Sequence, residues 1–156
     1  MQRTFVILAN ASLARLFSRD SANGALVPLA TLKHPESRLP GHDLADDRPG
    51  HEATDRSIGG NRYEPRSDAR RHEHTKFAHE IAHVLQARLA AGEYDTLWLL
   101  ASSPFLGELK AGLDHTVAAR VQLALPIDLT SLGLAEIEER LRVLHSEQQP
   151  GQRGAG

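Results

Sequence analysis

Two uninterrupted apolar runs constrain the fold of this chain more than any other feature. Residues 5–8 read Phe-Val-Ile-Leu, and residues 94–101 include the run Leu-Trp-Leu-Leu. A strand that is apolar at every position is typical of a sheet covered on both faces. A long helical pattern separates the two runs, and a strand–helix–strand crossover joins parallel strands. The sequence therefore predicts an α/β protein in which these two buried strands are parallel neighbours.

Two further strands are expected between the first apolar run and residue 33. Residues 13–18 alternate, with Leu13, Arg15 and Phe17 on one side of the strand. Asn23-Gly24 then offers the two positive-φ residues of a tight hairpin turn, and residues 25–32 form the third strand. Pro28 cannot donate a ladder hydrogen bond, so this strand is expected at the edge of the sheet. The first 33 residues therefore form an antiparallel meander.

Helices and strands alternate in the second half. A helix capped by Ser67 or Asp68 is expected to run to Gly92. Its apolar residues recur at helical spacing and form its buried face: Phe77, Ile81, Val84, Leu85 and Leu89. Ser103-Pro104 is a good helix start, with the Ser103 hydroxyl as the expected cap and proline at the first position. Residues 121–125 alternate as a last strand, and a final helix begins near Leu134.

Right-handed crossovers from a meander give a three-layer, mixed five-stranded sheet with helices on its faces. The expected strand order is 3-2-1-4-5, which is the ribonuclease H-like topology. At 156 residues, one α/β domain over residues 1–147 is expected, with a disordered tail over 148–156. Residues 34–66 form a long polar loop within it, rich in Pro, Gly, Asp, Arg and His.

Composition excludes several classes of protein. The chain has no cysteine, which rules out disulfides, iron–sulfur clusters and thiolate zinc sites. Its formal net charge of -2 argues against a strongly electrostatic nucleic-acid binder, although a local basic patch remains compatible with it. The apolar run at the N-terminus is shorter than a signal peptide requires, and no segment approaches a membrane span. We therefore expect a cytoplasmic protein.

The pentapeptide from His79 to His83 fits the zinc-protease pattern H-E-x-x-H, with Glu80 as the base. In a chain with nine histidines such a match has on the order of a few per cent chance of arising by accident. The helical spacing also places His79 and His83 in a stripe with His72, opposite the buried Ile81. We therefore expect these histidines to face solvent, with no catalytic metal and no cofactor, and the protein is not expected to be an enzyme.

The strongest binding signal lies in the loop before the long helix. Gly59-Gly60-Asn61 lets the backbone approach a ligand closely. Five arginines follow or flank it within sixteen residues: Arg56, Arg62, Arg66, Arg70 and Arg71. Guanidinium groups suit bidentate contacts to phosphate or carboxylate, so this set is a candidate RNA or phosphate site. A flexible turn with solubilising arginines is the plainer interpretation.

Several segments resemble a family of bacterial proteins described as required for attachment to host cells. They are residues 4–17, 34–39, 46–50, 76–82, 106–109 and 128–130, in the same order and spacing over about residues 3–145. The family usually carries an aspartate where Asn10 stands, and this departure disfavours a metal role there. Without that acid, the carboxylate cluster of a ribonuclease H-type nuclease is not expected.

The family in turn resembles the middle domain of the archaeal and eukaryotic peptide-chain release factor, whose Gly-Gly-Gln loop precedes a long helix and enters the ribosome. Gly59 and Gly60 match the glycines, whereas Asn61 is one methylene shorter than the glutamine. The resemblance implies a non-enzymatic, RNA- or ribosome-associated domain. The family description implies instead a protein-interaction module in surface attachment, and a zinc hydrolase using His79 and His83 is the third hypothesis. The oligomeric state stays open.

Overall fold

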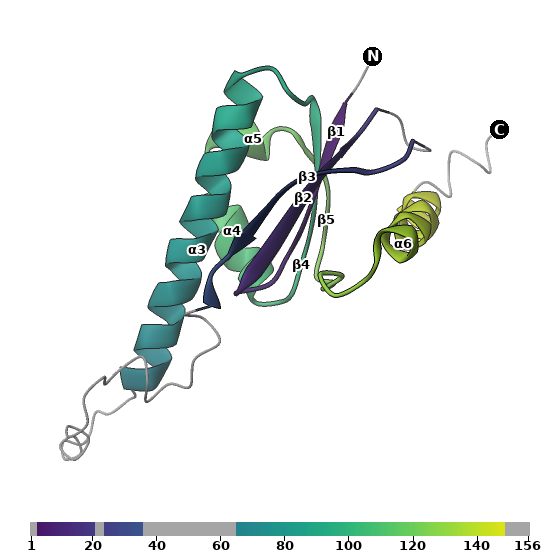
Figure 1. The fold of residues 1–156 in the computed structure, drawn as a ribbon. Coiled ribbons are helices and arrows are strands. Elements are labelled where there is room, and N and C mark those ends of the chain that lie inside the picture. The colour runs from purple at the N-terminus through teal and green to yellow at the C-terminus, as the bar shows by residue number, and fades with distance from the viewer. Residues whose placement is uncertain (1–2, 21–23, 36–64, 149–156) are drawn as a thin grey trace.

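The computed structural model describes residues 3–20, 24–35 and 65–148. They form a mixed five-stranded sheet with helices on both faces (Figure 1). The predicted α/β class and three-layer arrangement are therefore confirmed. Most of the polar loop predicted at 34–66, and residues 149–156 of the predicted tail, lie outside the described residues.

The sheet has the strand order β3-β2-β1-β4-β5, as predicted. Its strands are β1 (Thr4–Ala9), β2 (Leu13–Arg19), β3 (Val27–Lys33), β4 (Thr96–Ala101) and β5 (Val121–Leu125). β1 pairs antiparallel with β2 and parallel with β4, and β5 pairs parallel with β4. Pro28 lies in the edge strand β3, where its missing N–H removes no ladder bond from the centre of the sheet.

The central strands are buried on both sides because each face of the sheet has its own apolar core. Phe5 and Ile7 of β1 pack in the cluster that includes the helix residue Phe77. Val6 and Leu8 alternate with them and join the opposite cluster, which includes Ile137. The uninterrupted apolar runs of β1 and β4 follow from this two-sided burial.

In the described part of the chain, three helices pack on one face of the sheet and one helix packs on the other, and Figure 1 shows the two groups on opposite sides. The first group contains α3 (Pro65–Ala90), α4 (Phe105–Gly112) and α5 (His115–Ala118), and the opposite helix is α6 (Leu134–Gln148). Phe77, Ile81 and Leu85 of α3 are fully buried, while Val84 and Leu89 are half-buried. In the described part of the chain, no helix is both long enough and apolar enough to cross a membrane.

Both ends of α3 follow local backbone chemistry. The helix begins at Pro65, slightly before the predicted caps Ser67 and Asp68, because proline has no N–H to lose at a first helical position. As predicted, Gly92 lies at the end of the helix, and its φ is 76°. The Gly92 N–H donates to Leu89 O at 2.9 Å, and the Glu93 N–H donates to Arg88 O at 3.0 Å. These two bonds satisfy carbonyls that the end of a helix leaves open.

Two details of the second half differ from prediction. α4 begins at Phe105 rather than Pro104, and Pro104 occupies the cap position without a side-chain hydrogen bond. The predicted cap by Ser103 is therefore wrong. The short helix α5 was not predicted, and it starts where the Asp114 carboxylate accepts from the Thr116 N–H at 3.0 Å.

Candidate functional site

The predicted phosphate-contacting residues fall in two parts of the chain. Arg56, Gly59, Gly60, Asn61 and Arg62 lie outside the described residues, whereas Arg66, Arg70 and Arg71 belong to α3. Arg70 and Arg71 are exposed. Helical spacing places Arg70 on the same side of α3 as the buried Phe77 and Ile81. It is nevertheless exposed because the first turns of α3 extend past the edge of the sheet (Figure 1).

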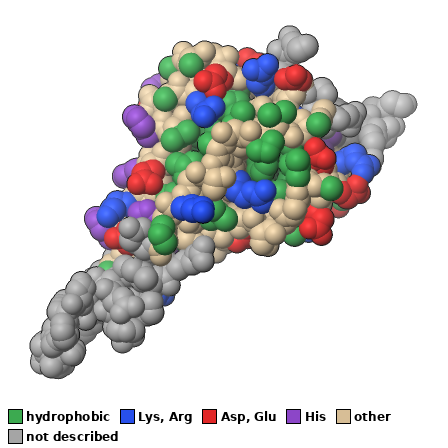
Figure 2. Space-filling model, in the orientation of Figure 1, with side chains coloured by type: hydrophobic (Ala, Val, Ile, Leu, Met, Phe, Trp, Pro, Cys, Tyr) green, Lys and Arg blue, Asp and Glu red, His purple; other side chains and the backbone are tan. Residues whose placement is uncertain are grey.

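The histidine stripe lies where the helical spacing predicted it. His72, His79 and His83 are exposed, on the side of α3 opposite the fully buried Ile81. Figure 2 shows histidine side chains along the edge of the molecule that α3 forms. Among the residues that the structure describes, no group of three or more His, Asp or Glu side chains could hold a metal ion. His79 and His83 therefore have no third ligand there.

His79 also has a packing role. A Cβ added at Gly112, the last residue of α4, would lie 3.2 Å from His79 Cδ2. The glycine lets the end of α4 approach the imidazole ring of α3 closely. Part of the ring therefore supports the contact between these two helices, although His79 remains an exposed residue.

A largely enclosed hydrogen bond fixes the start of α3 to the end of β3. His34, which follows β3, is only 6% exposed, and its Nε2 lies 2.7 Å from Glu73 Oε1. Lys76 Nζ lies 3.5 Å from the same oxygen. The His34 ring stacks on Phe77, with centroids 5.2 Å apart and an interplanar angle of 14°. We call His34, Glu73 and Lys76 the α3 clamp.

The clamp changes the electrostatics of Glu73. Burial raises its pKa, but the hydrogen bond from His34 and the charge of Lys76 together outweigh burial, so the pKa falls below its ordinary value. Glu73 therefore stays ionised and faces inward. Of the described side chains in residues 69–79, it is the only acid, so the exposed charges of that segment are those of Arg70, Arg71 and Lys76.

Two more contacts join the start of α3 to α4. Thr75 Oγ1 donates to Glu108 Oε1 at 3.2 Å. The His74 ring meets Phe105 edge-on, with centroids 6.3 Å apart. Burial and the nearby Arg70 charge lower the pKa of His74, and Glu108 opposes this shift. His74 is thus held as a packing residue rather than as an exposed cation.

A second polar network lies at the carboxyl end of β1. Asn10 Oδ1 accepts from the backbone N–H groups of Ser12 and Leu13, each at 2.9 Å. Asn10 Nδ2 donates to Asp128 Oδ2 and to Thr130 Oγ1, each at 3.1 Å. One amide therefore closes the β1–β2 turn and ties it to the segment after β5.

The amide of Asn10 suits this position better than a carboxylate would. An aspartate has no N–H to offer and would set a second negative charge against Asp128. Burial raises the pKa of Asp128, but hydrogen bonds from Thr130 and Asn10 lower it by more than burial raises it. The net pKa is below the ordinary value, so the carboxyl stays ionised. Asn10 therefore belongs to a structural hydrogen-bond network at the carboxyl end of β1, which is where a ribonuclease H-type nuclease would need a carboxylate.

The α3 clamp was not predicted from the sequence. His34 was noted only as the start of a family-like segment, and no role was predicted for Glu73. These residues lie 39 positions apart, and no periodic pattern connects a strand end to a distant helix. The one available signal was that Glu73 precedes Phe77 by four residues, which places it on the core side of α3.

Comparison with known proteins assigns the family. A profile described as "Protein required for attachment to host cells" matches residues 5–141. No curated protein matches the chain. Among solved structures, an archaeal translation termination factor is similar, with 12% identity and a TM-score of 0.46. The match covers 99% of this chain but 42% of that one, so this chain spans less than half of the termination factor. By its family profile, this chain belongs to the family of proteins required for attachment to host cells.

Proposed function

We propose that this protein is a non-enzymatic module that binds RNA phosphates, as on a ribosome, through the start of α3 and the loop before it. One observation carries the proposal. Arg70, Arg71 and Lys76 are exposed cations at the start of a helix that is held to β3 by the hydrogen bond between His34 and Glu73. We call these three residues the α3 basic end.

Rigid placement makes the basic end more than a solubilising surface. Glu73 is turned inward to His34, so it does not pair with Arg70 or Arg71 in the described structure. Guanidinium groups on an anchored helix bind phosphate with less loss of backbone freedom than groups on a segment that must first be ordered. Arg56, Arg62 and Arg66, with Gly59, Gly60 and Asn61, would extend this surface along the loop. Asn61 is shorter than the glutamine of the release-factor Gly-Gly-Gln loop, so we expect this loop to bind RNA rather than to hydrolyse peptidyl-tRNA.

Co-sedimentation with ribosomes over a series of salt concentrations tests the proposal. The double variant Arg70→Ala plus Arg71→Ala should bind less tightly, and its salt dependence should weaken by about 0.7–0.9 in log–log slope for each phosphate that it no longer neutralises. The control is Arg120→Ala plus Arg140→Ala, which removes two exposed arginines outside α3. Equal reductions in affinity for both variants, or no binding by the unsubstituted protein in low salt, would contradict the proposal.

The family description favours a second candidate function, which is a protein-interaction module in surface attachment. It requires the protein to act outside the cell that makes it. Deletion should then abolish adhesion, and only an exported copy should restore it. Rescue by a copy retained inside the cell would assign the attachment phenotype to an indirect effect.

A further inference from the structure

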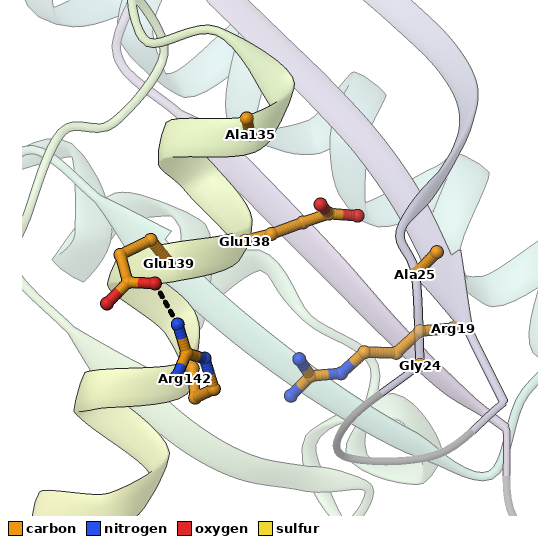
Figure 3. Close-up of a pocket in the computed structure, with 7 residues that line it drawn as sticks. All are labelled: Arg19, Gly24, Ala25, Ala135, Glu138, Glu139 and Arg142. Atoms are coloured by element: carbon orange, nitrogen blue, oxygen red, sulfur yellow. Dashed lines mark hydrogen bonds and ion pairs between the residues drawn. The ribbon is translucent and has the colours of Figure 1, made fainter.

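A pocket on the opposite face of the sheet contains a buried cation that forms no ion pair with any acid of the described residues. The pocket has a volume of about 350 Å³ and lies between the β2–β3 hairpin and α6. Its lining includes Arg19, Glu138, Glu139 and Arg142 (Figure 3). The Arg19 side chain extends from β2 toward α6, with its guanidinium group directed into this space.

Arg19 is only 5% exposed, and its Nε has no hydrogen-bond partner in the described part of the chain. Its guanidinium carbon lies 4.7 Å from the centroid of the Trp98 ring. That contact uses the face of the guanidinium, whereas its N–H donors point outward in the plane of the group. Burial lowers the pKa of Arg19, but a guanidinium remains charged at neutral pH. The cation is therefore largely desolvated, and its terminal nitrogens, rather than the enclosed Nε, are the donors that face the pocket.

The nearby acids are already engaged. Asp20 Oδ1 accepts from Arg3 Nε at 3.2 Å, and Glu138 Oε2 accepts from the Leu26 N–H at 2.8 Å. Glu139 is paired with Arg142 one helical turn along α6. An uncompensated buried charge costs stability, so the structure favours an external partner for Arg19.

We propose that this pocket binds a small molecule through a single carboxylate, with Arg19 as its recognition residue. A carboxylate matches the planar, two-donor edge of a guanidinium. Glu138 lines the same pocket and forms no ion pair with a described cation, so its charge opposes a ligand that carries a second negative charge. The volume is at the low end for ligand sites, which fits a small molecule. The site lies on the α6 face, so its test does not depend on whether the α3 basic end binds RNA.

The only tryptophan of the chain reports on this site, because Trp98 lies against Arg19. Sodium acetate is titrated against sodium chloride at constant ionic strength while Trp98 fluorescence is recorded. We expect a saturable change with a midpoint on the order of 1–10 mM, as for one charge-assisted contact. Acetate should also raise the thermal unfolding midpoint. Succinate and inorganic phosphate should bind more weakly, because each carries a second charge at a pH of about 7.5.

Arg19→Met should abolish both effects, whereas Arg140→Met, an exposed arginine of α6 outside the pocket, should keep them. Folding of Arg19→Met is checked by its unfolding midpoint without acetate, which should match or exceed that of the unsubstituted protein. An acetate response that persists in Arg19→Met would overturn the site. No response in the unsubstituted protein would overturn it as well, and tighter binding of phosphate than of acetate would overturn the carboxylate assignment.

Discussion

The two faces of the sheet treat buried charge in opposite ways. On the α3 face, His34 Nε2 lies 2.7 Å from Glu73 Oε1, and Lys76 sets a positive charge beside the same carboxylate. On the α6 face, Arg19 is buried beside Trp98, and its Nε is unsatisfied within the described residues. The first arrangement fixes a helix in place. The second leaves a buried guanidinium with a stacking contact to Trp98 but without an ion pair, which lowers stability.

The difference is informative because both faces have an ordinary apolar core. Phe77 lies under His34 on one face, and Trp98 lies under Arg19 on the other. Both sites therefore have an aromatic ring stacked beneath a nitrogen-containing group. They differ in whether that group has a hydrogen-bond partner in its own plane. A buried ion pair is expected in a structural joint, whereas an unpaired buried cation is the feature that indicates a ligand.

The largest expected effect concerns the platform of the α3 clamp. Phe77→Ala removes a side chain that is 0% exposed and stacks on both His34 and Phe105. Urea denaturation should show a loss of about 3–5 kcal/mol, as for other buried Phe-to-Ala changes. Val143→Ala on α6, where the side chain is 44% exposed, should change stability by less than about 0.5 kcal/mol. Similar losses of unfolding free energy in the two variants would show that Phe77 is not tightly packed against its neighbours on the α3 face.

A smaller and pH-dependent effect is expected for Glu73→Gln. The substitution keeps the shape but leaves His34 and Lys76 without a carboxylate, which should cost about 1–3 kcal/mol at pH 7. Because the folded pKa of Glu73 lies below its ordinary 4.5, its contribution is complete above pH 4.5 and is lost as pH falls through the folded value. The stability gap between the two proteins should therefore narrow below about pH 4.5. A gap that stays constant as the pH falls well below that value would mean that the Glu73 charge does not stabilise the clamp.

The sheet could be predicted because each strand is marked by a pattern within its own short stretch of sequence. The uninterrupted run in β1, the alternation in β2 and Pro28 in β3 each define one strand. Crossover handedness then orders these strands without knowledge of any side-chain contact. Helix ends were less predictable: Ser103 has a good capping side chain but makes no capping bond, since Pro104 takes that position.

The two buried-charge sites could not be predicted in the same way. His34 and Glu73 meet only after the chain has crossed from β3 to α3, so neither residue carries a local signal. Arg19 was missed for a different reason, because the predicted strand ended at residue 18. Continuing the alternation by one residue puts Arg19 on the same side of β2 as Arg15 and Phe17, which places it beneath a helix.

The sharpest test uses two arginines of the same strand. Arg15 and Arg19 both lie on the α6 face of β2, and each guanidinium lies over an aromatic ring, at 5.2 Å and 4.7 Å respectively. Arg15 Nη1 also donates to Thr130 O and to Leu132 O, each at 2.9 Å. Arg15→Met should therefore cost about 1–2 kcal/mol, because it leaves two part-buried carbonyl groups without their donor.

Arg19→Met removes no comparable pair of bonds. It replaces a desolvated, unpaired charge by an apolar side chain of similar length, so the unfolding free energy in acetate-free buffer should stay unchanged or rise by up to about 1 kcal/mol. Urea unfolding of both variants in chloride buffer makes the comparison. A loss for Arg19→Met as large as that for Arg15→Met would show that Arg19 has a structural partner in solution. Both faces of the sheet would then neutralise their buried charge internally.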